Sequence, residues 1–121
     1  MRTVLLDVLK GAKVIEIQNQ LEAFCDKLDC RSIDIVDRRI GGRTYAVMCG
    51  EESLSREPQI VSAINEDGKP MFVGNLMFFH RQKGELSGLS KDDIDYLLTH
   101  INTKYIKFYD LPRPTLTHCE F

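Results

Sequence analysis

Residues 65–80 read NEDGKPMFVGNLMFFH and carry the strongest folding signal in the chain. Asp67-Gly68 predicts a turn, because glycine accepts a positive φ without steric cost and aspartate can hydrogen-bond to its own backbone. Pro70 limits how the following strand can begin. Residues 71–79 are almost entirely apolar, which is typical of a strand covered on both faces. The other elements must therefore be arranged to cover this strand.

The chain has the length and composition of one globular domain. It has 121 residues, of which 43% are hydrophobic and 28% are charged, so neither disorder nor a fibrous class is favoured. We expect a single domain over residues 1–121, with an extended tail from about residue 110. The net charge of −2 lacks the positive field that sequence-independent nucleic-acid binding needs. We therefore do not expect nucleic acid as a partner, although a local basic patch stays open.

The cysteines and the N-terminus indicate the compartment. The four cysteines are Cys25, Cys30, Cys49 and Cys119. They lack the paired short spacings of a zinc site and the density of a small secreted scaffold, so we expect reduced thiols in a cytoplasmic protein. Asp7 and Lys10 interrupt the apolar N-terminus before it reaches the length of a signal peptide, and no other stretch is long enough to cross a bilayer. We expect no membrane partner, no metal and no other cofactor.

A hairpin and a helix are expected in the first part of the chain. Residues 3–8 and 13–17 contain β-branched residues and flank a turn at Lys10-Gly11. From Asn19, a candidate cap, apolar residues recur at helical spacing. This stripe consists of Leu21, Phe24, Cys25 and Leu28.

The clearest hairpin surrounds Gly41-Gly42. Two β-rich runs, residues 33–36 and 43–49, flank this pair, and the primed turns of tight hairpins need a positive φ. We expect a polar loop at residues 50–58 and a short extended piece at residues 59–64, which leads into the Asp67-Gly68 turn.

A second helix is expected to begin at Ser90. Asp93 follows three residues later, as in a capping box, and its charge suits the positive end of the helix dipole. The buried stripe consists of Ile94, Leu97, Leu98 and Ile101. Beyond it, residues 105–109 predict an edge strand, and we expect Pro112 and Pro114 to end regular pairing. The whole pattern predicts an α+β domain in which a mainly antiparallel sheet of about five or six strands is covered by two helices.

Several ordered blocks of sequence carry a family resemblance. They are residues 1–7 (MRTVLLD), 15–17 (IEI), 30–36 (CRSIDIV), 40–42 (IGG), 62–65 (SAIN), 70–76 (PMFVGNL), 89–90 (LS) and 116–121 (LTHCEF). In these blocks the chain resembles the domain-of-unknown-function 3846 family of bacterial and phage proteins. Other branches of that family carry an Asn-Arg-Ala block after the central hairpin. Here residues 54–57 read LSRE, so only Arg56 corresponds and a role attached to that block is not transferred.

The resemblance implies a small accessory protein of a phage or other mobile element. We expect a non-enzymatic module that binds and modulates a host protein, with counter-defence as one specific version. The alternative is a small-ligand or nucleotide-binding protein. An enzyme is a third hypothesis, and the sequence contains no recognisable catalytic constellation that would identify a catalytic residue.

Four residues are candidates for ligand binding. Arg38, Arg39 and Arg43 cluster around the Gly-Gly turn, where they could contact phosphates or simply keep an exposed tip in solution. Asn75 interrupts an apolar run, and its amide could contact a ligand or satisfy the backbone at a bulge. In the ligand-binding hypothesis the arginines and Asn75 share a pocket.

Three aromatic residues near the C-terminus are candidates for partner binding. Tyr105, Phe108 and Tyr109 could pack an edge strand, form a homodimer contact or stack on bases. We favour packing, because aromatic residues without a wider basic field are weak evidence for nucleic acid.

Overall fold

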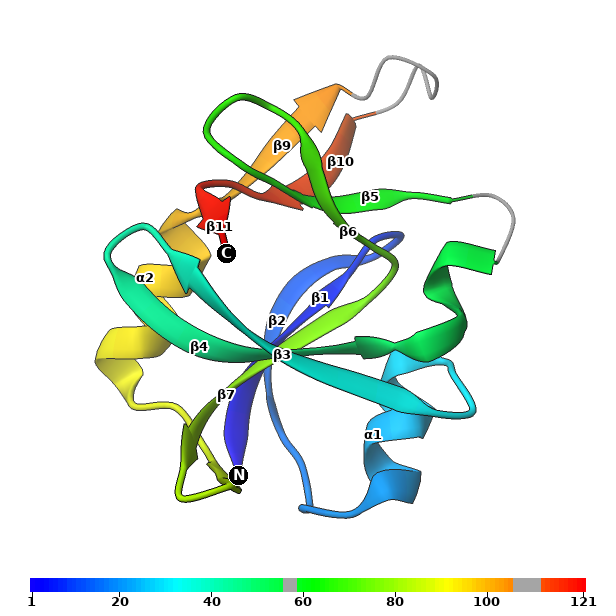
Figure 1. The fold of residues 1–121 in the computed structure, drawn as a ribbon, viewed down its shortest axis with the longest axis vertical. Coiled ribbons are helices and arrows are strands. Elements are labelled where there is room, and N and C mark those ends of the chain that lie inside the picture. The colour runs from blue at the N-terminus through cyan, green and yellow to red at the C-terminus, as the bar shows by residue number, and fades with distance from the viewer. Residues whose placement is uncertain (56–58, 106–111) are drawn as a thin grey trace.

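The computed structural model describes residues 1–55, 59–105 and 112–121 and has the expected α+β architecture (Figure 1). The elements are β1 (Arg2–Asp7), β2 (Gly11–Glu16), α1 (Leu21–Leu28), β3 (Ile33–Ile40), β4 (Arg43–Gly50), the 3-10 helix η1 (Glu51–Ser55), β5 (Val61–Ile64), β6 (Pro70–Val73), β7 (Leu76–Gln82), β8 (Glu85–Ser87), α2 (Lys91–Thr99), β9 (Ile101–Tyr105), β10 (Pro112–Leu116) and β11 (Cys119–Glu120).

Two sheets are present rather than one sheet of five or six strands. The larger has seven strands in the order β11-β3-β4-β7-β1-β2, with β8 added to β7, and all its pairs are antiparallel. The smaller has the order β6-β5-β10-β9, in which β10 and β5 are parallel. The prediction of a mainly antiparallel sheet with two helices is confirmed, and the strand count is higher than expected.

The apolar stretch that organises the fold is split between these sheets. Residues 76–79 of β7 are fully buried between β4 and β1, so the prediction of a strand covered on both faces is confirmed for this part. Residues 71–73 belong instead to β6 and are half-buried. The expected single strand breaks at Gly74-Asn75 because Gly74 has a φ of +80° and redirects the chain.

Each face of the larger sheet has its own core. On one face, Phe24 of α1 packs against Phe79, with ring centroids 5.7 Å apart. On the other face, Leu97 of α2 and Leu116 of the smaller sheet belong to the same core as Phe78. In Figure 1, α1 and α2 accordingly lie on opposite sides of the sheet.

The two helices begin differently. Ser90 is the N-cap of α2, as predicted, and its Oγ accepts a hydrogen bond from the Asp93 N–H at 3.2 Å. The prediction of Asn19 as the cap of α1 is wrong, because the helix starts at Leu21 and Gln20 occupies the cap position without a side-chain bond. With 8 and 9 residues, neither helix of the described chain has the length and hydropathy of a membrane span.

The predicted Gly41-Gly42 hairpin is confirmed. Ile40 pairs with Arg43 across the turn, and Gly41 has a φ of +62°. The Tyr96 hydroxyl of α2 donates to the Ile40 carbonyl and accepts the Gly42 N–H, each at 2.9 Å. Helix α2 thereby holds the tip of the hairpin.

The C-terminal prolines do not end regular pairing, which corrects the prediction for this segment. Pro112 and Pro114 pair with β9 in β10, and β11 then joins β3. Prolines two residues apart direct their nitrogen atoms to the same edge, so the intervening Arg113 keeps its N–H for the other edge. The segment after residue 110 is extended, but its described part is built into both sheets.

Candidate functional site

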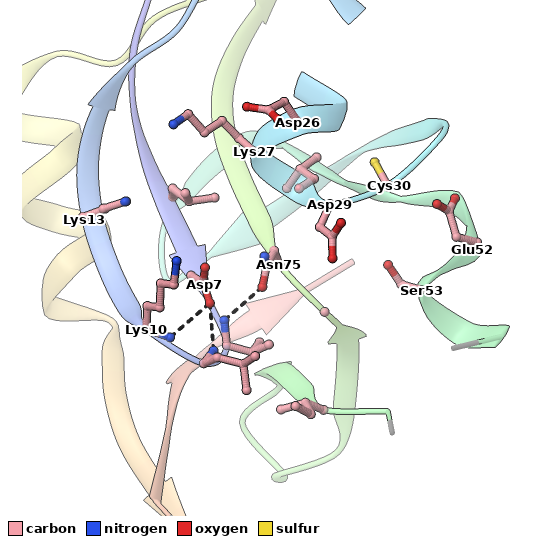
Figure 2. Close-up of a pocket in the computed structure, with 16 residues that line it drawn as sticks. Asp7, Lys10, Lys13, Asp26, Lys27, Asp29, Cys30, Glu52, Ser53 and Asn75 are labelled. Atoms are coloured by element: carbon pink, nitrogen blue, oxygen red, sulfur yellow. Dashed lines mark hydrogen bonds between the residues drawn. The ribbon is translucent and has the colours of Figure 1, made fainter. Parts of the chain in front are cut away.

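A cleft of about 560 Å³ opens between the β1–β2 turn and the C-terminal end of α1 (Figure 2). Five stretches of chain line it: residues 5–13, 26–30, 52–53, 60 and 74–75. The break between β6 and β7 therefore lies in its wall. A volume of this size is typical of small-molecule sites.

The β1–β2 turn is held by two side chains. Asp7 Oδ1 accepts the N–H groups of Leu9 and Lys10 at 2.9 Å and 3.0 Å. Asn75 Oδ1 accepts the Val8 N–H at 3.0 Å. A short acidic side chain at the end of a strand commonly satisfies turn amides in this way. These bonds fix the edge of the cleft.

Gly74 allows the chain to pass close to η1. Its N–H donates to the Ile60 carbonyl at 2.9 Å, and its φ of +80° is one that side chains rarely allow. A Cβ atom added there would lie 3.1 Å from Ser53 Oγ. Glycine at this position therefore permits the bend and the close approach that shape this wall.

Three lysines lie on one side of the cleft. Lys10 comes from the turn after β1, Lys13 from β2 and Lys27 from the last turn of α1, and Figure 2 shows all three on the same side of Asn75. Their side chains are exposed. None of the three forms an ion pair within residues 1–55, 59–105 and 112–121. This side of the cleft therefore presents three ammonium groups that no described carboxylate pairs directly.

Four carboxylates also line the cleft: Asp7, Asp26, Asp29 and Glu52. Glu52 Oε1 accepts the Arg31 N–H at 2.7 Å, and Asp7 holds the turn. Figure 2 shows Asp29 and Glu52 across Asn75 from the lysines. In Figure 2, Asp7 lies on the same side as the lysines and Asp26 is next to Lys27, so that side has three cationic and two acidic side chains.

A second polar cluster centres on Asp93 at the start of α2. Asp93 Oδ2 lies 2.7 Å from His80 Nε2 and accepts from Ser90 Oγ at 3.0 Å, while Oδ1 accepts from Tyr45 at 2.7 Å and Arg43 at 3.1 Å. Burial favours the neutral acid, but the hydrogen bonds from His80, Tyr45 and Ser90 outweigh it and lower the pKa of Asp93 to about 2. Asp93 is therefore a carboxylate at neutral pH.

This cluster joins α2 to the sheet. Burial, reinforced by the hydrogen bond to Asp93, raises the pKa of the Tyr45 hydroxyl far above its ordinary value, so Tyr45 remains a donor. Tyr45 belongs to β4, His80 to β7 and Asp93 to α2. None of these residues lines the cleft. The described contacts of the cluster fix the position of a helix.

The structure does not bring the three candidate arginines together. Arg43 contacts Asp93 and also Asp92, 2.9 Å from its Oδ2. The Arg38 guanidinium lies 4.7 Å from the ring centre of Phe121, and Arg39 is exposed. None of the arginines lines the cleft.

The other candidate residues have different outcomes. Asn75 lines the cleft, and its oxygen also satisfies a backbone N–H, so both predicted roles of the amide stay relevant. Tyr105 is the last residue of the edge strand β9, which starts at Ile101, and the rest of the edge strand expected at residues 105–109 lies outside the described residues. The prediction of Ile101 in the second helix is wrong, because α2 ends at Thr99. Phe108 and Tyr109 lie outside the described residues. Ligand binding by Asn75 and partner binding by the aromatic residues remain predictions.

Lys10, Lys13 and Lys27 were not predicted as site residues. Lys10 and Lys13 were predicted in a turn and a strand, and Lys27 lies between residues of the predicted helix stripe without being part of it. Isolated surface lysines have no motif spacing, and only the position of α1 beside the β1–β2 turn brings these three together.

In the described chain, no group of three or more His, Cys, Asp or Glu residues could hold a metal ion.

Comparison with known proteins gives one match. Residues 1–102 match the model of a family described as Domain of unknown function (DUF3846), and this range includes all the described residues that line the cleft. No curated protein and no solved structure matches the chain.

Proposed function

Since the chain belongs to the DUF3846 family, whose description names no activity, we propose its function from the geometry of the cleft. The protein is a non-enzymatic binding module that holds a small polar molecule between the β1–β2 turn and the end of α1. The proposal keeps the ligand-binding alternative that was predicted from the sequence. It assigns the charged contacts to the lysines of the cleft in place of the three arginines.

One observation carries this proposal. The cleft has the volume of a small-molecule site, and its polar groups converge from segments that are far apart in the sequence. Its edge is fixed in advance by the bonds of Asp7 and Asn75. A site formed before binding loses less conformational entropy when the ligand enters.

A thermal-shift screen tests the proposal. The probes are small anionic, neutral and cationic molecules, and a bound ligand raises the melting temperature by mass action. In the Asp26→Trp variant, the indole sits at the cleft and should abolish the shift. Glu22→Trp is the matched control, because Glu22 is exposed one helical turn earlier and does not line the cleft. A shift that both variants retain, or no shift with any probe, contradicts the proposal.

Binding of a host protein by a mobile-element accessory module is the second candidate function. The specific observation in its favour is on the N-terminal hairpin, where Leu9 and Val14 are 68% and 47% exposed. Strand β2 lies at the end of the strand order, and edge strands can pair with another chain.

In a pull-down from host lysate, Val14→Lys should lose the partner. The control Leu21→Lys, at another exposed apolar side chain, should retain it, and equal capture by both contradicts this function.

A cytoplasmic location is part of both candidates. It is supported by the four cysteines, none of which forms a disulfide in the described part of the chain. Burial raises the pKa of both Cys49 and Cys119 to about 11, so these thiols stay protonated at neutral pH. Fractionation of cells that express the protein is the direct test, and recovery outside the cytoplasm contradicts this location.

A further inference from the structure

We propose that the ligand of the cleft is a small organic phosphate, whose phosphate group is bound by Lys10, Lys13 and Lys27. This inference rests on the proposed function and specifies its ligand class. A nucleoside monophosphate and a sugar phosphate share this chemistry, and the experiment below distinguishes them.

Among the residues that the structure describes, no ion pair involves the ammonium groups of the cleft, nor the carboxylates of Asp7 and Asp26. By contrast, Arg2 and Arg43 form ion pairs with Glu16 and Asp92 at 3.0 Å and 2.9 Å. Lys10, Lys13 and Lys27 form none with the described residues. Lysine binds phosphate as a point charge, and a dianion can satisfy several ammonium groups at once.

Two of the four carboxylates that line the cleft already accept hydrogen bonds from the protein backbone. Asp7 Oδ1 is occupied by two N–H groups of the turn, and Glu52 Oε1 by the Arg31 N–H. Asp29 lies with Glu52 on the side away from the lysines, and Asp26 is exposed on α1. Three lysines therefore face two carboxylates, Asp7 and Asp26, on this side of the cleft, and the excess positive charge attracts an anion there.

Asn75 supplies a donor between the two sides. Its Oδ1 is committed to Val8, whereas its Nδ2 donates to no residue that the structure describes. The bond to Val8 fixes the amide orientation, so the Nδ2 donor is available to an oxygen of the ligand. An ester or hydroxyl oxygen beside the phosphate is a suitable acceptor.

The apolar lining and the size of the cleft favour an organic phosphate over inorganic phosphate. Leu5, Val8, Leu28 and Ile60 contribute buried apolar side chains to the lining. A volume of about 560 Å³ also exceeds what a lone phosphate needs. The remainder can hold a sugar or a base.

Calorimetric titration of the full chain tests this inference. The probes are adenosine monophosphate, ribose 5-phosphate, adenosine, ribose and inorganic phosphate. We expect at least one organic phosphate to bind at least about tenfold more tightly than its phosphate-free counterpart and than inorganic phosphate. Adenosine monophosphate alone would identify a nucleotide, and equal binding of ribose 5-phosphate would identify the sugar phosphate as sufficient.

Charge-neutralising variants locate the phosphate. Lys10→Gln, Lys13→Gln and Lys27→Gln should each weaken the organic phosphate several-fold and leave any binding of the phosphate-free compound unchanged. Lys91→Gln on α2 makes the same charge change away from the cleft and should have no effect. Melting temperatures of the variants check that each one is folded.

Two outcomes overturn the inference in different ways. If neutral or cationic molecules bind the cleft as tightly as the phosphates do, the proposed function stands and the phosphate assignment is wrong. If no molecule of any charge binds, the proposed function itself fails.

Discussion

The Asn75 side chain continues the pairing of β1 with β7 beyond the last paired residues of the two strands. Leu6 pairs with Leu76, and one step further Asn75 Oδ1 accepts the Val8 N–H at 3.0 Å. The amide thereby takes the place of a backbone carbonyl where the chain breaks between two sheets. The same side chain lines the cleft, so the fold and the candidate site depend on one contact.

Replacing Asn75 separates these two roles. Asn75→Ala leaves the part-buried Val8 N–H without its partner and should lower the free energy of unfolding by about 1–2 kcal/mol. Asn75→Asp keeps the acceptor, so it should stay near the wild-type stability while its added negative charge weakens an anionic ligand. Urea unfolding and calorimetry measure the two effects. Equal stability of Asn75→Ala and the wild type would contradict the structural role.

A pair of glycine variants isolates the close approach of Gly74 to Ser53. Gly74 and Gly68 both have a φ of +80°, but a Cβ atom at Gly68 meets nothing within 4 Å. Gly68→Ala should therefore lower the free energy of unfolding by about 1 kcal/mol, through the strained backbone conformation alone. Gly74→Ala should cost more, because its methyl group lies 3.1 Å from Ser53 Oγ. If urea unfolding shows the same loss of unfolding free energy for both variants, Ser53 moves away from the added methyl group without cost.

Thr3 bridges the two central strands where their backbones do not pair directly. Its buried hydroxyl donates to the Phe78 carbonyl and accepts the Phe78 N–H at 3.2 Å. Thr3→Val preserves the shape and removes both bonds, so it should lower the free energy of unfolding by about 2–3 kcal/mol. Thr3→Ser keeps the hydroxyl and should lose only about 1 kcal/mol from the missing methyl group. If Thr3→Ser is as unstable as Thr3→Val, packing and not hydrogen bonding explains this position.

Asp93 should make the protein sensitive to acid. Its folded pKa of about 2 lies below its ordinary value of 3.8, so its stabilisation is complete above about pH 4 and is lost as the pH falls towards 2. Asp93→Asn should be about 2 kcal/mol less stable at neutral pH, and the difference should shrink in acid. Urea unfolding between pH 7 and about pH 3 measures how the free energy of unfolding of the wild type and of Asp93→Asn changes with pH.

Asp92→Asn is the control for this prediction. The Asp92 side chain is 81% exposed and contacts Arg43 at the surface, so its removal should change stability by less than about 1 kcal/mol. Parallel pH profiles for Asp93→Asn and the wild type would show that the hydrogen bonds of Asp93 do not favour its charged form.

Local sequence signals predicted most elements correctly. The Gly41-Gly42 turn, the Ser90 cap and the apolar run at residues 76–79 all act through neighbouring residues, and each lies where it was expected. The division into two sheets was missed because it depends on Gly74, whose positive φ redirects one long apolar run. The pairing of Pro112 and Pro114 was missed because it needs a distant strand on the correct edge.

The candidate site was harder to predict than the fold. Asn75 was recognisable because an amide in an apolar run is unusual. Lys10, Lys13 and Lys27 were not, because their common feature is a position in space on three different segments. The predicted arginine cluster failed for the opposite reason. The three residues Arg38, Arg39 and Arg43 are close in sequence, but the structure places them in separate environments.

The most direct test of the central claim is to map ligand contacts on isotope-labelled protein by amide chemical shifts. With adenosine monophosphate and ribose 5-phosphate as probes, the account predicts that the largest changes fall in residues 7–13, 26–30 and 74–75, around the cleft. Changes confined to the Gly41-Gly42 hairpin near Arg43, or a spectrum that neither probe alters, would contradict it.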